Sequence, residues 1–402
     1  MMDVGIDHMA TYVPNQYLSL KDLALARNVD ENKFLVGIGI EEMAVPLPSE
    51  DAVVLAANAG YRALKEAGVS PSDIGLLIVG TESAEDKAKP TATHVHSLLG
   101  ISEACRVYDI IHACAGASYA LVSALDWVRS SSSHKYALVI ATDIARYGIG
   151  TPGEPTQGAG AVAMLVSKAP RLIKLEELST YSSSVYDFWK PMDQPYPIVK
   201  GVYSVQCYLK AVSACFKQIE INRNFAFIYH TPYPKLVEKA HAEVVSLMGG
   251  ESDWKDHYKD KVLVSNKYPS KIGNTYTAGL WLSLVSFLEV AYEDAIAQGV
   301  NPASAIERHE GIYMFSYGSG SGAVLMRGEL ADSWPSMVGL FRVRHALEQR
   351  RRLTVHEYEQ MLQNDALLPE ANALGSSRFR YSGVKNSERQ YLRINELKQF
   401  EI

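Results

Sequence analysis

Apolar residues gather in short runs along the chain, and each run ends in a short polar or glycine-rich segment. Runs of this length without strict alternation are typical of strands that are covered on both faces. Between the runs, helical spacing of apolar residues predicts helices over 51–67, 116–128 and 279–297. The alternation of strand and helix indicates an α/β protein. The predicted strands span 76–79, 107–111, 137–141, 161–166, 225–229, 262–264, 312–315 and 323–326.

A faint internal repeat divides the chain in two. The segment at 160–164 reads GAVAM, and 162 positions later the segment at 322–326 reads GAVLM, each after a glycine-rich turn. This repeat predicts two similar halves, 1–167 and 168–402. The second half is expected to carry a C-terminal helical extension, in which 354–364 forms a surface helix.

Composition and charge exclude several classes of protein. The 402 residues are 47% hydrophobic and 21% charged, which is typical of a globular protein and not of a disordered one. The formal net charge of −6 argues against a general nucleic-acid binder. Four cysteines are too few for a disulfide scaffold, so we expect thiols in a reducing compartment. Residues 1–12 lack the pattern of a secretory signal, and no run approaches the roughly 20 apolar residues of a membrane span. These features predict a soluble cytoplasmic protein.

Reactive side chains follow several of the predicted strands. In open α/β sheets, ligands bind beyond the carboxyl ends of the strands. Glu82, Cys114 and Asp143 follow three strands of the first half, and His230 and Ser316 follow two strands of the second. The sequence therefore predicts a site built from these strand ends.

Cys114 is the candidate nucleophile. It precedes a stretch of small residues at 115–120 that leads into a helical pattern, and a thiol at the N-terminus of a helix is expected to have a lowered pKa. The alternative is a buried cysteine that acts only as a small apolar residue. Cys207 and Cys215, eight positions apart in a helical pattern, are assigned to the core.

Glu82 and His230 are the candidate acid–base groups. Glu82 stands in a polar loop and could be only a solvated acid. His230 precedes Thr231 and Pro232, which favours an extended backbone, and a histidine opposite a reactive thiol is a general-acid candidate. His94 and His96 lack further ligands at metal spacing, so no metal site is predicted.

Longer motifs extend over most of the chain and resemble 3-hydroxy-3-methylglutaryl-CoA synthases of the thiolase superfamily. The match runs from Gly5 to about Arg327 and continues more weakly into the tail. The motifs are Gly80-Thr81-Glu82-Ser83, Ala113-Cys114, Asp143-Ile144-Ala145-Arg146-Tyr147, Gln157-Gly158-Ala159-Gly160, Tyr186-Asp187-Phe188-Trp189, His230-Thr231-Pro232-Tyr233, Gly273-Asn274 with Tyr276-Thr277, and Phe315-Ser316-Tyr317-Gly318.

The resemblance implies a duplicated thiolase-like fold in five layers, α/β/α/β/α, and an enzyme of the mevalonate pathway. It implies condensation of acetyl-CoA with acetoacetyl-CoA and water, with these thioesters as substrates and no other cofactor. Cys114 would be acetylated, Glu82 would take the methyl proton of the acetyl group, and His230 would orient and protonate the ketone oxygen. The proposed oxyanion donors are the backbone N–H groups of Cys114 and Ser316.

The resemblance also implies substrate-binding residues and partners. Asn274 and Ser316 would contact the second substrate, and Tyr147 and Asp143 would shape the acyl pocket. The remaining pair, which would lie near the CoA entrance, is Lys235 and Lys239. Family members are homodimers, so a homodimer is expected here.

Three positions depart from the family pattern: His112, Ala115 and Lys200. Ala115 replaces a usual tyrosine and is expected to enlarge the acyl pocket, and Lys200 replaces a usual acid. Two alternatives therefore stay open. One is a synthase for polyketide β-branching that takes acyl groups from an acyl carrier protein, and the other is a catalytically silent scaffold that binds a thiolase partner.

Overall fold

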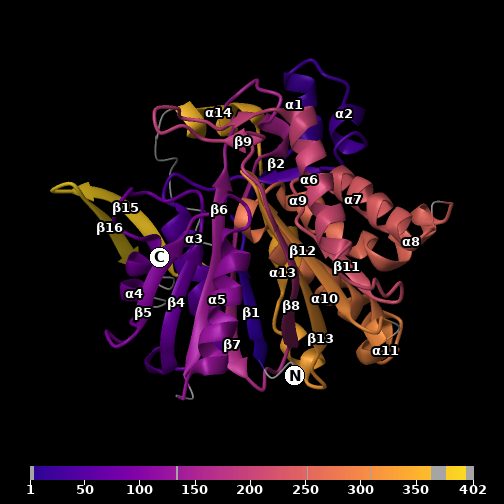
Figure 1. The fold of residues 1–402 in the computed structure, drawn as a ribbon. Helices are drawn as coiled ribbons and strands as arrows, with labels where there is room; N and C mark the ends of the chain where they lie inside the picture. Colours follow the sequence, from indigo (N-terminus) through magenta and orange to yellow (C-terminus); the bar gives the residue numbers. More distant parts are fainter. Residues whose placement is uncertain (1–3, 133–134, 251, 308, 364–376, 395–402) are drawn as a thin grey trace.

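A nine-stranded sheet runs through the molecule in the order β11-β12-β13-β8-β1-β7-β6-β4-β5 (Figure 1). The computed structural model describes residues 4–132, 135–250, 252–307, 309–363 and 377–394. The strands of this sheet are β1 (Val4–Tyr12), β4 (Ile74–Gly80), β5 (Arg106–Ile110), β6 (Tyr136–Ala145), β7 (Gly158–Lys168), β8 (Ile173–Ser182), β11 (Ala226–Tyr229), β12 (Ile312–Gly318) and β13 (Gly322–Leu330).

The two ends of this sheet repeat one pattern. In the first half β1 is antiparallel to β7, β7 is antiparallel to β6, and β6 is parallel to β4. In the second half β8, β13, β12 and β11 follow in the same orientations. The repeated segments 160–164 and 322–326 lie in the equivalent strands β7 and β13. The halves join through β1 and β8, where the described residues form two pairs, Gly5 with Lys174 and Ile6 with Ile173.

Helices cover both faces of each half, which produces the predicted five layers. Side chains alternate along the strands: Ile78 of β4 faces the central cluster, and Leu77 and Val79 face the outer one. The central helices, whose buried faces share one cluster, are α5 (Gly116–Ser130) and α10 (Gly279–Ala297). The outer helices are α3 (Ala52–Ala67) and α4 (Thr91–Leu99) on the first half, and α6 (Gly201–Phe216) and α7 (Pro234–Leu247) on the second.

The strand predicted at 262–264 is wrong. Val262 follows α8 (Trp254–Lys261), and its N–H donates to Tyr258 O at 2.9 Å. The next residues form a 3-10 helix, η3 (Leu263–Asn266). A run of three apolar residues does not distinguish a strand from a buried turn, because burial alone accounts for both. The main sheet therefore has five strands from the first half and four from the second among the described residues.

The tail returns to the first half of the chain. The expected surface helix is α14 (Val355–Gln363), with Asn364 outside the described residues. Instead of covering the second half, α14 packs with α1 (Leu20–Ala26), β2 (Gln16–Ser19) and β3 (Glu42–Ala44). The preceding segment contains α12 (Trp334–Val338), α13 (Val343–Glu348) and β14 (Arg351–Leu353).

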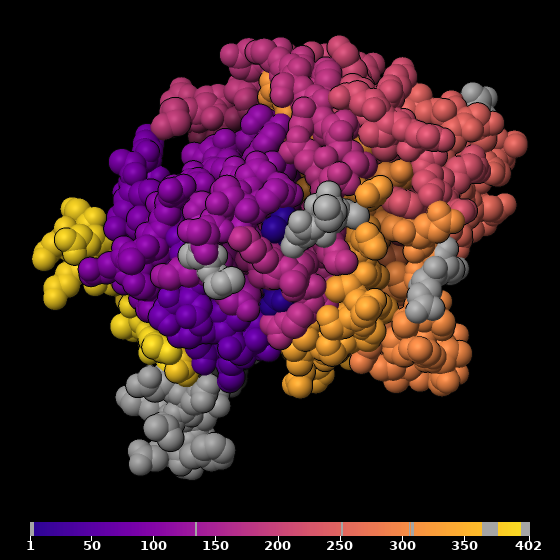
Figure 2. Space-filling view, turned by 60° about the horizontal axis from the view of Figure 1, so that its bottom comes forward, coloured from indigo at the N-terminus to yellow at the C-terminus, as the bar shows by residue number. Residues whose placement is uncertain are grey.

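A hairpin follows α14 in the tail, formed by β15 (Phe379–Lys385) and β16 (Glu388–Arg393). Figure 2 shows the hairpin in yellow against the purple first half. Its Tyr391 hydroxyl donates to Asp51 Oδ2 at 2.8 Å, at the start of α3. The tail thus contributes both helices and strands, and its last described part covers the first half.

Within the described ranges, no helix is long and apolar enough to cross a membrane.

Candidate active site

Cys114 and Glu82 meet at one edge of the sheet because β4 and β5 are neighbouring parallel strands. Cys114 lies between the end of β5 and the start of α5, after Ala113, whose φ of 40° is in the left-handed region. The Cys114 thiol donates to Glu82 Oε1 at 3.4 Å. The structure therefore brings the predicted nucleophile and the predicted base into direct contact.

Burial controls the protonation of this pair. It raises the pKa of Glu82 to about 8, and the charge of Asp143 raises it further. Burial also holds the pKa of the Cys114 thiol well above its ordinary value, and the charge of Glu82 adds to this shift. The predicted lowering of the Cys114 pKa by the helix is therefore wrong, because desolvation and nearby acids outweigh the dipole of α5.

Asp143 fixes the loop that carries Glu82. Its Oδ1 accepts hydrogen bonds from Thr81 Oγ1 at 3.0 Å, from Glu82 N at 2.9 Å and from Ser83 Oγ at 2.8 Å. Its Oδ2 accepts from Thr277 N at 3.0 Å and Thr277 Oγ1 at 2.6 Å. Burial raises the pKa of Asp143 to about 6. Since Thr277 belongs to the second half, Asp143 ties the Glu82 loop to that half.

His230 and Ser316 lie side by side at the ends of parallel strands. The register pairs Tyr229 with Phe315, and His230 N donates to Phe315 O at 2.7 Å. Burial lowers the pKa of His230 to about 3, so its ring is neutral at physiological pH. Within the described part of the chain, His230 Nδ1 and Ser316 Oγ are buried without a hydrogen-bond partner. These groups therefore have unused hydrogen-bonding capacity.

The second half also closes against the cysteine loop. An added Cβ at Gly318, the last residue of β12, would lie 2.4 Å from His112 O and 2.7 Å from Ala115 N. This contact leaves no room for a side chain at Gly318. The end of β12 and the loop carrying Cys114 therefore form one continuous floor of the site.

Aromatic rings line another side of the site. The Tyr147 ring packs edge-on against Tyr276 at 6.1 Å and against Phe188 at 6.3 Å between centroids. Asn274 Oδ1 accepts a hydrogen bond from Tyr276 N at 2.9 Å. Burial raises the pKa of the Tyr147 phenol, although hydrogen bonds with Tyr276 and Asn274 oppose the shift. The structure thus brings Tyr147 and Asn274 together around Tyr276.

Tyr276 and Thr277 belong to the site but were not selected from the sequence as site residues. Thr277 bonds Asp143, and Tyr276 packs on Tyr147 with its own φ at 42°. Their signal was present in the motif that also contains Asn274. A motif gives the order of residues along the chain and not their contacts in space. The motif therefore did not reveal that Thr277 meets Asp143 and that Tyr276 meets Tyr147.

A cavity of about 910 Å³ opens in front of Glu82. Its lining includes Phe188 and Tyr276 together with Arg380 and Arg389 of the hairpin. Neither Lys235 nor Lys239 is among its lining residues.

The two lysines lie on α7 instead. Lys235 Nζ forms an ion pair with Glu238 at 2.7 Å, and Lys239 is exposed one turn further along the helix. In the part of the chain that the structure describes, no group of three or more His, Cys, Asp or Glu side chains is arranged to hold a metal ion.

Comparison with protein-family models identifies the chain over almost its whole length. Residues 1–170 match the model "Hydroxymethylglutaryl-coenzyme A synthase N terminal". Residues 173–247 and 252–374 match "Hydroxymethylglutaryl-coenzyme A synthase C terminal". The chain belongs to the hydroxymethylglutaryl-CoA synthase family. The family predicted from the motifs is confirmed, and its members are acyltransferases.

Individual relatives agree with this family assignment. The hydroxymethylglutaryl-CoA synthase of Enterococcus faecalis is 34% identical over 97% of this chain and 100% of its own. That of Haloferax volcanii is 29% identical, covering 89% of this chain and 91% of its own.

Solved structures of the hydroxymethylglutaryl-CoA synthase family share the fold. MvaS in complex with 3-hydroxy-3-methylglutaryl coenzyme A has a TM-score of 0.89 at 35% identity, covering 98% of this chain and 99% of its own. The HMG synthase of the curacin biosynthetic pathway, in complex with an acetyl donor carrier protein, has a TM-score of 0.86 at 25% identity, covering 97% and 100%. The predicted thiolase-like fold is confirmed.

The three departures from the family pattern have definite surroundings. Ala115 is fully buried, and its Cβ would lie 2.8 Å from a Cβ at Gly318. Lys200 Nζ lies 5.3 Å from the centre of the Trp189 ring. His112 packs against Tyr119 with 4.9 Å between ring centroids. Ala115 is not a lining residue of the large cavity, so its small side chain serves the close approach of Gly318.

Proposed function

We propose that this acyltransferase condenses acetyl-CoA with acetoacetyl-CoA and water to 3-hydroxy-3-methylglutaryl-CoA and CoA through an acetyl group on Cys114. Membership of the hydroxymethylglutaryl-CoA synthase family supports the overall reaction and its place in the mevalonate pathway. The observation that carries the mechanism is the 3.4 Å contact between the Cys114 thiol and the Glu82 carboxylate in a buried site.

In the first step Glu82 takes the thiol proton, and Cys114 Sγ attacks the carbonyl carbon of acetyl-CoA. The bond from this carbon to the CoA sulfur breaks, and CoA leaves with the proton that Glu82 held. The thiol needs this help because its pKa is raised by burial, and a thiolate is the nucleophilic form. The products are acetyl-Cys114 and free CoA.

In the second step ionised Glu82 takes a proton from the acetyl methyl group, and the resulting carbon attacks the ketone of acetoacetyl-CoA. The ketone oxygen becomes an alkoxide and takes the proton that Glu82 removed, relayed by the His230 ring, so Glu82 returns to its ionised form and the ring stays neutral. Backbone N–H groups of Cys114 and Ser316 would stabilise the enolate oxygen. Water then cleaves the Cys114 thioester, which frees the product carboxylate and restores the thiol.

Several residues are proposed to hold the substrates. Asn274 and Ser316 would contact acetoacetyl-CoA, and Tyr147 would form a wall of the acyl pocket. Asp143 would shape that pocket indirectly, by fixing Glu82. Lys235 and Lys239 lie one turn apart on α7, a spacing that suits contact with CoA phosphates.

Free CoA thioesters are favoured over carrier-bound groups. The structure with 3-hydroxy-3-methylglutaryl coenzyme A is 35% identical to this chain, and the one with a carrier protein is 25% identical. Parallel assays with acetoacetyl-CoA and with acetoacetyl carrier protein separate the two substrates. If the protein turns over the carrier-bound substrate and not acetoacetyl-CoA, it is instead a synthase for polyketide β-branching.

We propose a cytoplasmic homodimer in which β5 of one copy pairs with β5 of the other. β5 is the last strand of the main sheet, and the Ile111 side chain beyond it is 72% exposed. An exposed strand edge is suited to pairing with a second chain. Sedimentation equilibrium would measure the mass, and a monomer at micromolar concentration would overturn this assignment.

The acetylation step can be tested with isotope-labelled acetyl-CoA. The label should appear on the peptide that contains Cys114 and disappear in Cys114→Ser. Cys207→Ser is the matched control, because Cys207 is buried on α6, and it should retain the label. Unlabelled Cys114 in an otherwise folded chain would exclude the acetyl-cysteine mechanism and favour the scaffold.

A further inference from the structure

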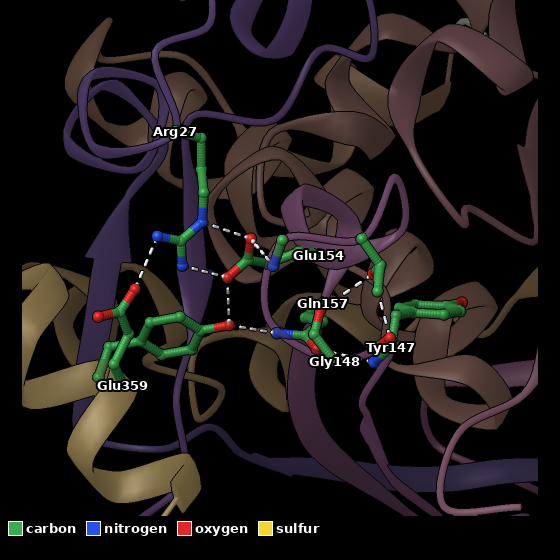
Figure 3. Close-up of polar contacts among 9 residues, drawn as sticks. Arg27, Tyr147, Gly148, Glu154, Gln157 and Glu359 are labelled. Carbon is green, nitrogen blue, oxygen red and sulfur yellow. Dashed lines mark hydrogen bonds and ion pairs between the residues drawn. The ribbon is translucent and has the colours of Figure 1, made fainter.

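A chain of buried hydrogen bonds connects the tail helix α14 with the backbone of Tyr147 (Figure 3). Tyr147 N donates to Gln157 Oε1 at 2.7 Å, and Gln157 Nε2 donates to the Tyr358 hydroxyl at 2.7 Å. The Tyr358 hydroxyl donates to Glu154 Oε1 at 3.2 Å. A carboxylate only accepts, so the Tyr358 proton points to Glu154, and the orientation of the Gln157 amide follows from that. Each group in the chain therefore has one defined role.

An ion pair anchors the far end of this chain. Arg27 follows α1 and donates to Glu154 through Nε at 2.8 Å and Nη2 at 2.7 Å. Its third nitrogen, Nη1, donates to Glu359 of α14 at 2.6 Å. The Glu154 side chain is only 2% exposed, so the bidentate arginine compensates a buried charge. Glu154 is thus held between two helices from opposite ends of the chain.

The same short segment is braced by Glu154 and holds Tyr147 at two further points. Glu154 Oε2 accepts from Gly150 N at 2.9 Å, and Thr151 Oγ1 donates to Tyr147 O at 3.0 Å. An added Cβ at Gly153 would lie 2.6 Å from Tyr147 Cγ, so the ring rests directly on this glycine. The backbone N–H, the carbonyl and the ring of Tyr147 are therefore all located by residues 150–157.

We infer that Arg27, Glu154, Gln157 and Tyr358 are positioning residues that set the place of the Tyr147 ring in the acyl pocket. The inference rests on the proposed function, in which Tyr147 lines that pocket. These four residues act through Tyr147 and through the segment 150–157. The Tyr147 ring packs on Tyr276 and Phe188, so a shift of its backbone changes the aromatic wall beside Cys114. Small displacements near reacting groups cost large factors in rate.

The first test is Tyr358→Phe, which removes the hydroxyl and retains the ring. We expect the rate of Cys114 acetylation to fall about 5- to 10-fold, the range for one lost buried hydrogen bond. Tyr313→Phe is the matched control: its buried hydroxyl bonds Asn222 N and Glu220 O, and Tyr313 lies near the start of β12, away from the strand end that carries Ser316. This control should acetylate at the unmodified rate. Equal rates for the two variants would overturn the inference.

The second test separates positioning from general stability. If Tyr358 acts through the Tyr147 ring, Tyr358→Phe should cause no further loss in a Tyr147→Ala background. The acetylation rate of slow variants is measured from the label that accumulates on Cys114 over hours. Circular dichroism checks that each variant is folded. If Tyr358→Phe lowers the acetylation rate 5- to 10-fold both with Tyr147 present and in the Tyr147→Ala background, the inference is overturned. The proposed function would still stand, because the unmodified chain is acetylated. Absence of acetylation in the unmodified chain would instead overturn the proposed function and this inference together.

Discussion

At the scale of single residues, Glu82 and Cys114 compete for one proton in a buried site. Burial disfavours charge on both groups. The charge of Glu82 and its hydrogen bond with the thiol raise the pKa of Cys114 further, whereas the same hydrogen bond lowers the pKa of Glu82 and opposes part of the effect of burial. The thiol is therefore protonated at rest, and its reactivity depends on ionised Glu82. This dependence makes the site sensitive to pH through a carboxyl group.

The acetylation rate should rise with pH up to about 8. The raised pKa of Glu82 means that its basic form is scarce below about 8 and complete above it, so the rate should fall about 10-fold per pH unit below that value. His230, with its pKa near 3, should add no inflection between pH 5 and 9. Stopped-flow release of CoA measures the profile.

Glu82→Gln provides the control for this profile. The variant should be slow at every pH and should lose the inflection near 8, because the amide does not ionise. A similar inflection in Glu82→Gln would show that another group titrates.

His230→Ala should separate the two half-reactions. The ring lies at the end of β11 beside Ser316, where it is proposed to serve the ketone and not the thiol. Acetylation should change by less than about 3-fold, whereas product formation should fall about 100- to 1,000-fold, within the usual range for acid–base groups. Labelled acetyl-enzyme should therefore accumulate. Loss of acetylation to the same extent as condensation would contradict this division of roles.

At the scale of elements, one asparagine of α3 binds the backbone at the start of the hairpin. Asn58 Oδ1 accepts from Arg378 N at 2.5 Å and Phe379 N at 3.2 Å, and Asn58 Nδ2 donates to Phe379 O at 3.3 Å. Asn58→Ala should lower the free energy of unfolding by about 2–3 kcal/mol, because it leaves buried backbone groups unpaired. Urea denaturation measures this change.

Asn32→Ala is the matched control for the hairpin prediction. Asn32 is exposed and bonds only Asp30 among the side chains whose contacts are described, so its loss should cost less than about 0.5 kcal/mol. Limited proteolysis should cut the hairpin faster in Asn58→Ala than in Asn32→Ala. Equal stability of the two variants would show that the hairpin is held by other contacts.

The sequence predicted elements best where local pattern and final burial agree. Strands such as β4 and β6 are covered on both faces, so their apolar runs are continuous and can be recognised in the sequence. The place of Glu82, Cys114 and His230 followed from the ends of such runs. The direction of the shift in the Cys114 pKa could not be predicted from the sequence, because the shift depends on burial and on the charge of Asp143 from another strand. The role of Asn58 was equally hidden, since its partners lie more than 300 positions away.

At the scale of the whole molecule, the site lies on the seam between the two halves. Glu82 and Cys114 come from the first half, and His230, Asn274 and Ser316 come from the second. Among the residues that the structure describes, main-sheet pairing across the seam consists of two residue pairs of β1 and β8. Side-chain contacts such as that of Thr277 with Asp143 therefore help to fix one half against the other.

Thr277→Val should weaken this seam with little change in shape. It removes the hydroxyl that donates to Asp143 Oδ2 at 2.6 Å, so a buried carboxylate loses a donor. We expect the free energy of unfolding to fall by about 1–3 kcal/mol and acetylation to fall about 10-fold, because Asp143 also holds Glu82. Thermal unfolding and CoA release measure the two effects.

Thr93→Val is the control for the seam. Its hydroxyl donates to Pro90 O at 2.8 Å within the first turn of α4, on the outer face of the first half. It should leave acetylation unchanged. Normal acetylation in Thr277→Val would show that the seam does not depend on this hydroxyl.

The return of the tail to the first half also sets an order of events during synthesis. A ribosome makes the first half long before α14 and the hairpin, and domains fold as they emerge. Until the tail is made, the site beside α3 where Phe379 packs is open, Glu154 lacks its hydrogen bond from Tyr358, and Arg27 lacks its ion pair with Glu359. The outer cover of the first half and the support of Tyr147 by Tyr358 are therefore both added late, so a nascent chain acquires its complete acyl pocket only after α14 has been made.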